Sequence, residues 1–150
     1  MKAARVWIAS DHAGVATKSD LAVFVRELGH EVVDLGPGDT TSVDYPDFAH
    51  RLARAVVDEP GSWGVLICGS GIGMSIAANK ISGARAALVH SAYTARMARH
   101  HNDANIVVLG SRVLGPEVMR ESLRAFATHG FTPGDDGRHA RRVEKIEPSL

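Results

Sequence analysis

Short apolar runs rich in β-branched residues alternate along this chain with longer stretches of helical periodicity. The runs span residues 6–9, 31–35, 65–68, 86–89 and 106–109, and each is followed by Ser, Gly or His. Runs of this length and composition predict five strands. In the stretches between and after them, apolar residues recur at three- and four-residue spacing, which predicts helices that turn one apolar stripe toward a sheet. These stripes lie within residues 21–28, 48–56, 93–97 and 119–126.

Two of the predicted helices carry an independent start signal. Pro46 and Pro116 stand where a first-turn proline belongs, and Asp47 and Glu117 beside them complement the positive end of the helix dipole. Alternation of strands and helices with short connections requires crossovers. We therefore expect an α/β fold, an open three-layer α/β/α sandwich with a parallel sheet. Within residues 132–150, the stretch TPGDDG is typical of a linker, and the basic segment after it is expected to form a C-terminal helical extension.

The length of the chain indicates one compact domain that spans residues 1–150. Its charge and cysteine content disfavour several classes of function. Seventeen Lys and Arg residues balance seventeen Asp and Glu residues, so the strong field of a dedicated nucleic-acid binder is absent. The sequence contains no membrane-spanning apolar run and no signal-peptide pattern, so we expect neither membrane insertion nor export. A single cysteine cannot form an internal disulfide, which favours a cytoplasmic location.

Polar residues follow the first, third and fifth predicted strands, where ligands bind in open parallel sheets. They occupy residues 10–12, 68–73 and 110–112. The second of these segments, CGSGIG, contains three alternate glycines that let backbone N–H groups converge on an anion at the start of the next helix. We interpret it as an anion-binding loop.

Three known uses of similar loops are disfavoured by spacing. A dinucleotide fingerprint requires G-x-G-x-x-G, but this loop runs G-x-G-x-G, and no acidic residue closes the following strand. A cysteine phosphatase of the C-x5-R type needs an arginine to hold the phosphate at the position where Met74 stands. A serine-hydrolase elbow, G-x-S-x-G, would need glycine in place of Cys68.

Cys68 itself allows two interpretations. A lone cysteine that ends a buried strand is commonly a small apolar side chain. A thiol beside converging amides at a helix N-terminus is instead favoured as the thiolate, which makes it a base or nucleophile. The adjoining anion-binding loop adds weight to the reactive interpretation.

Three other polar groups also keep more than one interpretation. Asp11 and His12 fit a structural hydrogen-bonding pair, substrate contacts or, least well, a metal pair, because the chain has no H-x-x-x-H or H-E-x-x-H spacing. The segment HHND at residues 100–103 either complements a helix dipole or is functional. Arg138 and Arg142 share a helix face suited to holding a phosphate, while a solvated basic tail is the simpler alternative.

Six ordered segments together resemble the family of type B ribose-5-phosphate isomerases and galactose-6-phosphate isomerases. The resemblance runs nearly from end to end and is far more specific than any one loop. The segments are ASDHAG (9–14), DYPDFA (44–49), ICGSGIGMSIAANK (67–80), RHHNDAN (99–105), LGSRV (109–113) and GRHARRV (137–143).

The resemblance implies a Rossmann-like, five-stranded parallel sheet and a metal-independent enzyme without a cofactor. It also implies a homodimer, or a tetramer built from such dimers, whose active sites draw residues from both chains. One branch of the family replaces the cysteine by a carboxylate six positions later; Met74 at that position places this chain in the cysteine branch.

The family's site residues are carried over by position in the matching segments. Cys68 corresponds to the catalytic base, and Asp11 and His101 to the residues that open the sugar ring. The family's anion hole corresponds to Ser70 and the amides of Gly69, Gly71 and Gly73. Its substrate contacts correspond to His12, Tyr45 and Asn102. Its phosphate ligands correspond to Arg138 and Arg142, with Arg112 as a third that reaches across the dimer.

The resemblance therefore predicts an aldose–ketose isomerase that interconverts ribose 5-phosphate and ribulose 5-phosphate through an enediolate. Isomerisation of galactose 6-phosphate, allose 6-phosphate or a tetrose phosphate is an alternative that would use the same catalytic residues. A non-catalytic sugar-phosphate sensor is a further alternative, but a sensor has no need of a base such as Cys68.

Overall fold

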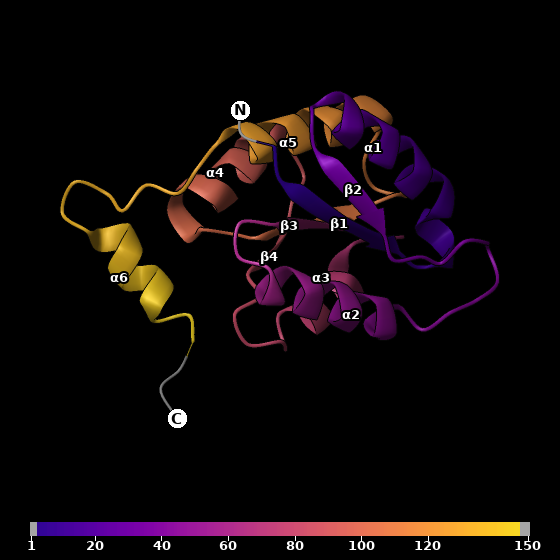
Figure 1. Ribbon diagram of the computed structural model, residues 1–150, viewed down its shortest axis with the longest axis horizontal. Helices are drawn as coiled ribbons and strands as arrows, with labels where there is room; N and C mark the ends of the chain where they lie inside the picture. Colours follow the sequence, from indigo (N-terminus) through magenta and orange to yellow (C-terminus); the bar gives the residue numbers. More distant parts are fainter. Residues whose placement is uncertain (1–2, 148–150) are drawn as a thin grey trace.

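The computed structural model describes residues 3–147, and predictions for residues 1, 2 and 148–150 lie outside this range. Its centre is the expected five-stranded parallel sheet, with strand order β2-β1-β3-β5-β4 (Figure 1). The strands are β1 (Arg5–Ser10), β2 (Glu31–Asp34), β3 (Trp63–Cys68), β4 (Ala86–Leu88) and β5 (Ile106–Gly110).

Helices cover both faces of the sheet, which confirms the predicted three-layer sandwich (Figure 1). Helices α1, α4 and α5 pack on one face and α2 and α3 on the other. Helix α6 lies beside α4, outside the sandwich, and forms the predicted C-terminal extension. The helices are η1 (His12–Gly14), α1 (Val15–Glu27), α2 (Tyr45–Asp58), α3 (Ile72–Ala78), α4 (Ala92–Asn102), α5 (Pro116–Thr128) and α6 (Arg138–Glu144). None of the helices in residues 3–147 is long and apolar enough to cross a membrane.

The composition of the central strands explains why the core has two sides. Every residue of β3 and β5 is buried, as is typical of parallel strands covered on both faces. Because successive side chains of a strand point to opposite faces, Val65 and Ile67 pack toward α1, α4 and α5. Leu66 and Cys68 pack toward α2 and α3. The single thiol therefore lies at the last position of β3, on the α2–α3 face.

Both proline start signals are confirmed by the helix boundaries. Helix α2 begins at Tyr45 and has Pro46 and Asp47 in its first turn, while α5 begins at Pro116 with Glu117 next to it. Helix α3 has seven residues and starts directly after the glycine loop. It is too short to show a periodic apolar stripe, so periodicity alone does not reveal it.

The order of the strands places a topological switch point between β1 and β3. The chain leaves β1 to form β2 on one side, whereas β3, β5 and β4 lie on the other. In open α/β sheets, ligands bind outside the carboxyl ends of the strands at such a point. Ser10 and Cys68 are the last residues of β1 and β3 and mark its position.

His30 is a buried histidine at the opposite, amino edge of the sheet. Its Nδ1 accepts a hydrogen bond from the Ala4 amide at 3.2 Å, and its ring packs edge-on against Trp63. Its Nε2 has no hydrogen-bond partner within residues 3–147. Burial lowers the pKa of His30 below the ordinary histidine value, an effect that the hydrogen bond from Ala4 opposes.

We expect His30 to make the protein less stable in mild acid. A histidine whose pKa is lowered by folding binds its proton more readily in the unfolded chain. Its stability contribution is therefore complete above about pH 6.5 and declines as the pH falls through and below that value. His30→Gln removes this titration, so the free energy of unfolding should decrease less steeply from about pH 7 to about pH 5 than in the wild-type protein.

Urea unfolding at a series of pH values measures this difference. The control is His90→Gln, the same replacement at an exposed position. Parallel pH dependences for His30→Gln and the wild-type protein would contradict the assignment.

Candidate active site

An open hollow of about 370 Å³ lies at the switch point. It is bordered by residues from the ends of β1, β3 and β5, from the glycine loop and from the start of α2. All of them except Val113 belong to the site predicted from the sequence. The lining residues are Asp11, Tyr45, Cys68, Gly69, Ser70, Gly73, Arg112 and Val113.

The thiol of Cys68 faces a hydrogen-bond donor of the glycine loop. Its Sγ accepts a hydrogen bond from the Gly71 amide with an N···S distance of 3.1 Å. The next amide, that of Ile72, donates to Ser70 Oγ at 3.2 Å. Because an N–H group directed at sulfur stabilises negative charge there, this geometry favours a reactive thiol over a purely apolar one.

The glycine loop differs in one respect from the predicted anion-binding loop. Two of its amides are directed at the side chains of Cys68 and Ser70 and not at a common empty centre. The negative charge that the loop can stabilise therefore lies at or beside the sulfur. Gly71 has a φ of 81°, and a Cβ there would lie 2.5 Å from a methyl group of Leu88, so this turn requires glycine.

The segment after β5 holds the end of β3 in place. The amides of Ser111 and Arg112 donate to the carbonyl oxygens of Cys68 and Gly69 at 2.8 and 2.9 Å. Ser111 Oγ also lies 3.2 Å from the Cys68 carbonyl oxygen and 3.3 Å from that of Ala13. One serine thus connects η1, the end of β3 and the segment after β5. Sequence analysis placed Ser111 among the polar residues that follow the fifth strand but assigned it no role.

Arg112 brings positive charge to the hollow of its own chain. Its guanidinium lies over Gly69, with Nη1 3.5 Å from the position that a Cβ of Gly69 would take. The structure therefore places Arg112 beside the Cys68 loop. Its expected contact across a dimer stays a prediction.

Asp11 and His12 have different surroundings although they are adjacent. Asp11 borders the hollow and caps η1, because its Oδ1 accepts a hydrogen bond from the Ala13 amide at 2.9 Å. His12 is not among the lining residues, and its Nδ1 accepts from the Val43 amide at 3.3 Å. His12 therefore ties the loop before α2 to the end of β1. Asp11 thus has a structural role at η1, and its expected contact with a substrate stays a prediction.

Tyr45 closes one side of the hollow by packing on Gly73. A Cβ at Gly73 would lie 2.6 Å from Cζ of the Tyr45 ring and 3.0 Å from its hydroxyl oxygen. The absence of a side chain at this first turn of α3 thus allows the ring of α2 to lie against the loop. The glycine has a packing role that the sequence pattern did not indicate.

The remaining predicted residues lie at the other edge of the sheet. His101 and Asn102 end α4, which starts after the carboxyl end of β4 and ends just before the amino end of β5. Arg138 and Arg142 are exposed on α6, which packs on α4. Within one chain, the structure therefore brings together Asp11, Tyr45, Cys68, Ser70 and Arg112, and it separates this group from His101, Asn102, Arg138 and Arg142.

His101 and His139 join α4 to α6. The two ring centroids are 4.2 Å apart, and Nδ1 of the buried His139 lies 3.2 Å from the Thr132 carbonyl oxygen. Desolvation, followed by the positive charge of His139, His100 and Arg138, lowers the pKa of His101 below the ordinary histidine value. A neutral His101 can accept a proton at neutral pH. His139 was not a predicted site residue, although it lies within the GRHARRV segment.

Position 74 lies in the core and not in the hollow. Met74 is fully buried and packs with the α2–α3 side of the sheet. Among the described residues, no three His, Cys, Asp or Glu side chains come together as ligands of a metal ion would.

The fold and the hollow define the class of open α/β proteins that hold a small ligand at the carboxyl edge of a parallel sheet. Residues 6–146 match the family described as Ribose/Galactose Isomerase. The chain therefore belongs to the ribose/galactose isomerase family.

Individual relatives agree over almost the whole chain. The structure of Trypanosoma brucei type B ribose 5-phosphate isomerase matches with a TM-score of 0.92 and 48% identity and covers 97% of both chains. Escherichia coli ribose-5-phosphate isomerase B is 40% identical over 91% of this chain and 89% of its own. D-erythrulose-4-phosphate isomerase of Pectobacterium atrosepticum is 39% identical over 93% of this chain and 90% of its own.

We expect Gly73→Ala to displace the Tyr45 ring and open one side of the hollow. The added methyl group cannot fit at 2.6 Å from the ring, so the ring must move. If the hollow is the active site, kcat/KM should fall about tenfold or more, the scale that small displacements in a site produce.

The matched control for this substitution is Gly115→Ala. A Cβ at Gly115 meets no atom within 4 Å, so its addition leaves the packing intact. Activity of the two variants and a crystal structure of Gly73→Ala provide the measurement. An unmoved ring, or equal activity in the two variants, would refute the packing role.

Proposed function

We propose that this protein is a metal-independent aldose–ketose isomerase that interconverts ribose 5-phosphate and ribulose 5-phosphate, with Cys68 as the base. The observation that carries the proposal is the thiol at the end of β3, which faces the Gly71 amide and borders the same hollow as Asp11 and Arg112. The names of the relatives from E. coli and T. brucei support the choice of a five-carbon substrate.

The site has the groups that this reaction needs. The thiolate of Cys68 takes the proton from C2, the C1–C2 double bond forms, and negative charge collects on the former carbonyl oxygen. A proton passes from the C2 hydroxyl to that oxygen, and proton return to C1 leaves the carbonyl at C2. In this proposal, the glycine loop and the Arg112 guanidinium stabilise the developing charge beside the sulfur. Such stabilisation is usually the largest single contribution to catalysis.

The complete site in this proposal contains two chains. Asp11 and Cys68 lie at one edge of the sheet and His101 with the α6 arginines at the other, so the second group reaches the hollow only from a partner subunit. Four large apolar side chains near the carboxyl edge are exposed, as a surface covered by a second copy would be. They are Ile72, Ile76, Tyr93 and Val113. In the proposed dimer, Asp11 and the partner's His101 open the sugar ring. The sugar is contacted by His12, Tyr45 and the partner's Asn102. The phosphate is held by the partner's Arg138 and the partner's Arg142.

A shorter substrate is the second candidate. The relative from Pectobacterium atrosepticum is named for a four-carbon sugar phosphate, and it aligns with nearly the whole of this chain. The same base and loop would serve both substrates, because the reacting carbons are the first two in each. The distance from Cys68 to the phosphate-holding arginines then decides between them.

We expect Cys68→Ala to abolish isomerisation and to leave sugar-phosphate binding intact. Removal of a general base typically lowers kcat by about a hundredfold to ten-thousandfold. A coupled assay over four-, five- and six-carbon aldose phosphates measures turnover, and calorimetry measures binding to the variant. Substantial residual turnover would rule out Cys68 as the base. Turnover that a chelator abolishes would rule out metal independence, and wild-type binding without turnover would favour the sensor.

The two-chain site predicts complementation between two inactive variants. A Cys68→Ala subunit keeps His101, and a His101→Asn subunit keeps Cys68. A heterodimer of the two has one intact site out of two, so random exchange of equal amounts should restore about a quarter of the wild-type activity. The control is each variant mixed with itself. To form heterodimers, the two variants are mixed, unfolded and refolded together. If heterodimers form and the sample stays inactive, the site does not span two chains.

A further inference from the structure

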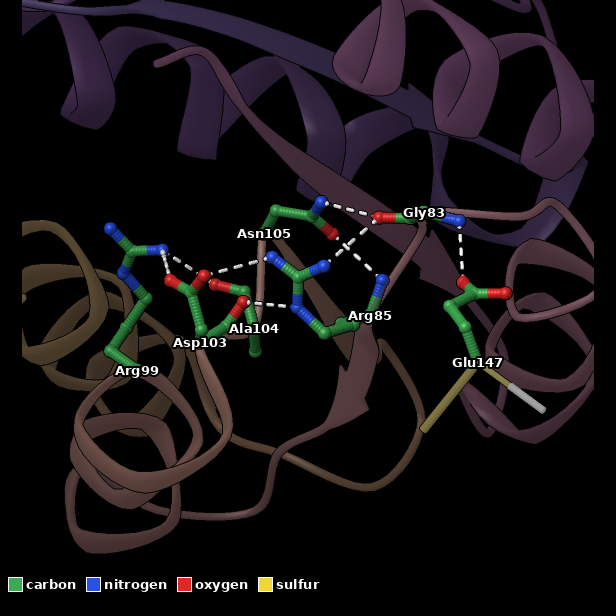
Figure 2. A network of polar contacts seen from close by, with 7 residues as sticks. All are labelled: Gly83, Arg85, Arg99, Asp103, Ala104, Asn105 and Glu147. Atoms are coloured by element: carbon green, nitrogen blue, oxygen red, sulfur yellow. Dashed lines mark hydrogen bonds and ion pairs between the residues drawn. The ribbon is translucent and has the colours of Figure 1, made fainter. Parts of the chain in front are cut away.

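The chain returns from α6 to the body of the protein at Ile146 and Glu147. Glu147 Oε1 accepts a hydrogen bond from the Gly83 amide at 2.6 Å (Figure 2). Its Oε2 accepts from Ser82 Oγ at 3.2 Å. Ile146 borders a small, mainly apolar hollow whose other lining residues come from β4, α4 and the segments next to them, among them Ala86 and Ala98. We call the contacts of Ile146 and Glu147 the C-terminal contact.

Gly83 also belongs to a network that fixes the end of α4. Its carbonyl oxygen accepts from Asn105 Nδ2 at 2.9 Å and from Arg85 Nη1 at 3.4 Å. Arg85 in turn donates to the Asp103 carbonyl oxygen and carboxylate at 2.7 and 3.0 Å. Figure 2 shows this continuous path from Glu147 to Asp103, the residue directly after His101 and Asn102.

Helix α6 is therefore held at both ends. At its start, His139 packs on His101 and lies within hydrogen-bond distance of the Thr132 carbonyl oxygen. After its end, Glu147 binds the turn at Ser82 and Gly83. Two fixed ends restrict the helix far more than one, because a segment attached at one end can swing about that attachment. Arg142 lies between the two attachments, and Arg138 directly precedes the first.

We propose that Glu147 is a positioning residue. It holds α6 so that Arg138 and Arg142 lie at a fixed distance from the His101 end of α4. That distance is the one at which the arginines can bind the phosphate of a sugar phosphate. This inference rests on the proposed function, because it is there that the arginines hold phosphate. Glu147 acts through the helix and does not touch the substrate. The network around Gly83 supplies the fixed point.

Glu144 provides a matched control on the same segment. It is an exposed glutamate of α6, and its side chain makes no hydrogen bond or ion pair within residues 3–147. Loss of either glutamate removes one negative charge from the same segment. A pure charge effect would tighten phosphate binding in both variants, whereas loss of positioning weakens it only when Glu147 is removed.

The test compares Glu147→Ala, Glu147→Gln and Glu144→Ala with the wild-type protein. In Glu147→Ala, we expect KM for the sugar phosphate to rise about fivefold with kcat within about twofold, and tryptic cleavage after Arg138, Arg141 or Arg142 to accelerate by a similar factor. Glu147→Gln keeps an acceptor oxygen for the Gly83 amide and should give intermediate values. Glu144→Ala should show neither change.

Proteolysis of the ligand-free protein separates this inference from the proposed function. If the wild-type protein has no isomerase activity, faster cleavage and weaker binding of inorganic phosphate in Glu147→Ala would still support positioning. Unchanged cleavage in Glu147→Ala would overturn the C-terminal contact. Faster cleavage with unchanged KM and phosphate binding would overturn the positioning role, and so would equal changes in Glu144→Ala. Thermal unfolding of each variant distinguishes these local effects from a general loss of stability.

Discussion

Because all five strands run in the same direction, the sheet has a carboxyl edge and an amino edge with different chemistry. Cys68, Asp11 and Arg112 lie at the first edge and His101 at the second. Strand β3 has six residues. At about 3.3 Å per residue, a strand of that length separates the two edges by roughly 16 Å. No side-chain rotation spans that distance. A reaction that uses both groups therefore requires a second chain, as in the proposed two-chain site.

The two groups also differ in how firmly the chain holds them. The Cys68 end of β3 is buried, and its carbonyl oxygens are bound by the amides of the segment after β5. Donors held in this way stabilise developing charge without first reorganising. The arginines of α6 are exposed and depend on contacts at the two ends of a short helix. In the proposed reaction, proton transfer thus takes place at the firmly held end of the sheet, and the phosphate is bound by an appended segment.

The fold could be predicted from the sequence because its signals are local. Apolar runs indicated all five strands, and Pro46 and Pro116 marked two helix starts that the structure confirms. The lining of the hollow was also largely predictable, since residues that end parallel strands must meet at one edge. Contacts between segments that are distant in the sequence could not be predicted. The packing of Tyr45 on Gly73, the link made by Ser111 and the binding of Glu147 to Gly83 depend on tertiary distances that no periodicity encodes.

The division between sheet and appended helix has a consequence for substrate choice. The reacting carbons of every aldose phosphate are the first two, so in the proposed reaction the Cys68 loop meets the same chemistry whatever the length of the sugar. The phosphate lies at the other end, and its distance from the loop changes with each added carbon. A change in the contacts that hold α6 can therefore alter the preferred length without altering the base, the loop or the core. Substitutions that change specificity are accordingly expected at the two ends of α6 and in the turn that binds Glu147, far from Cys68 in the same chain.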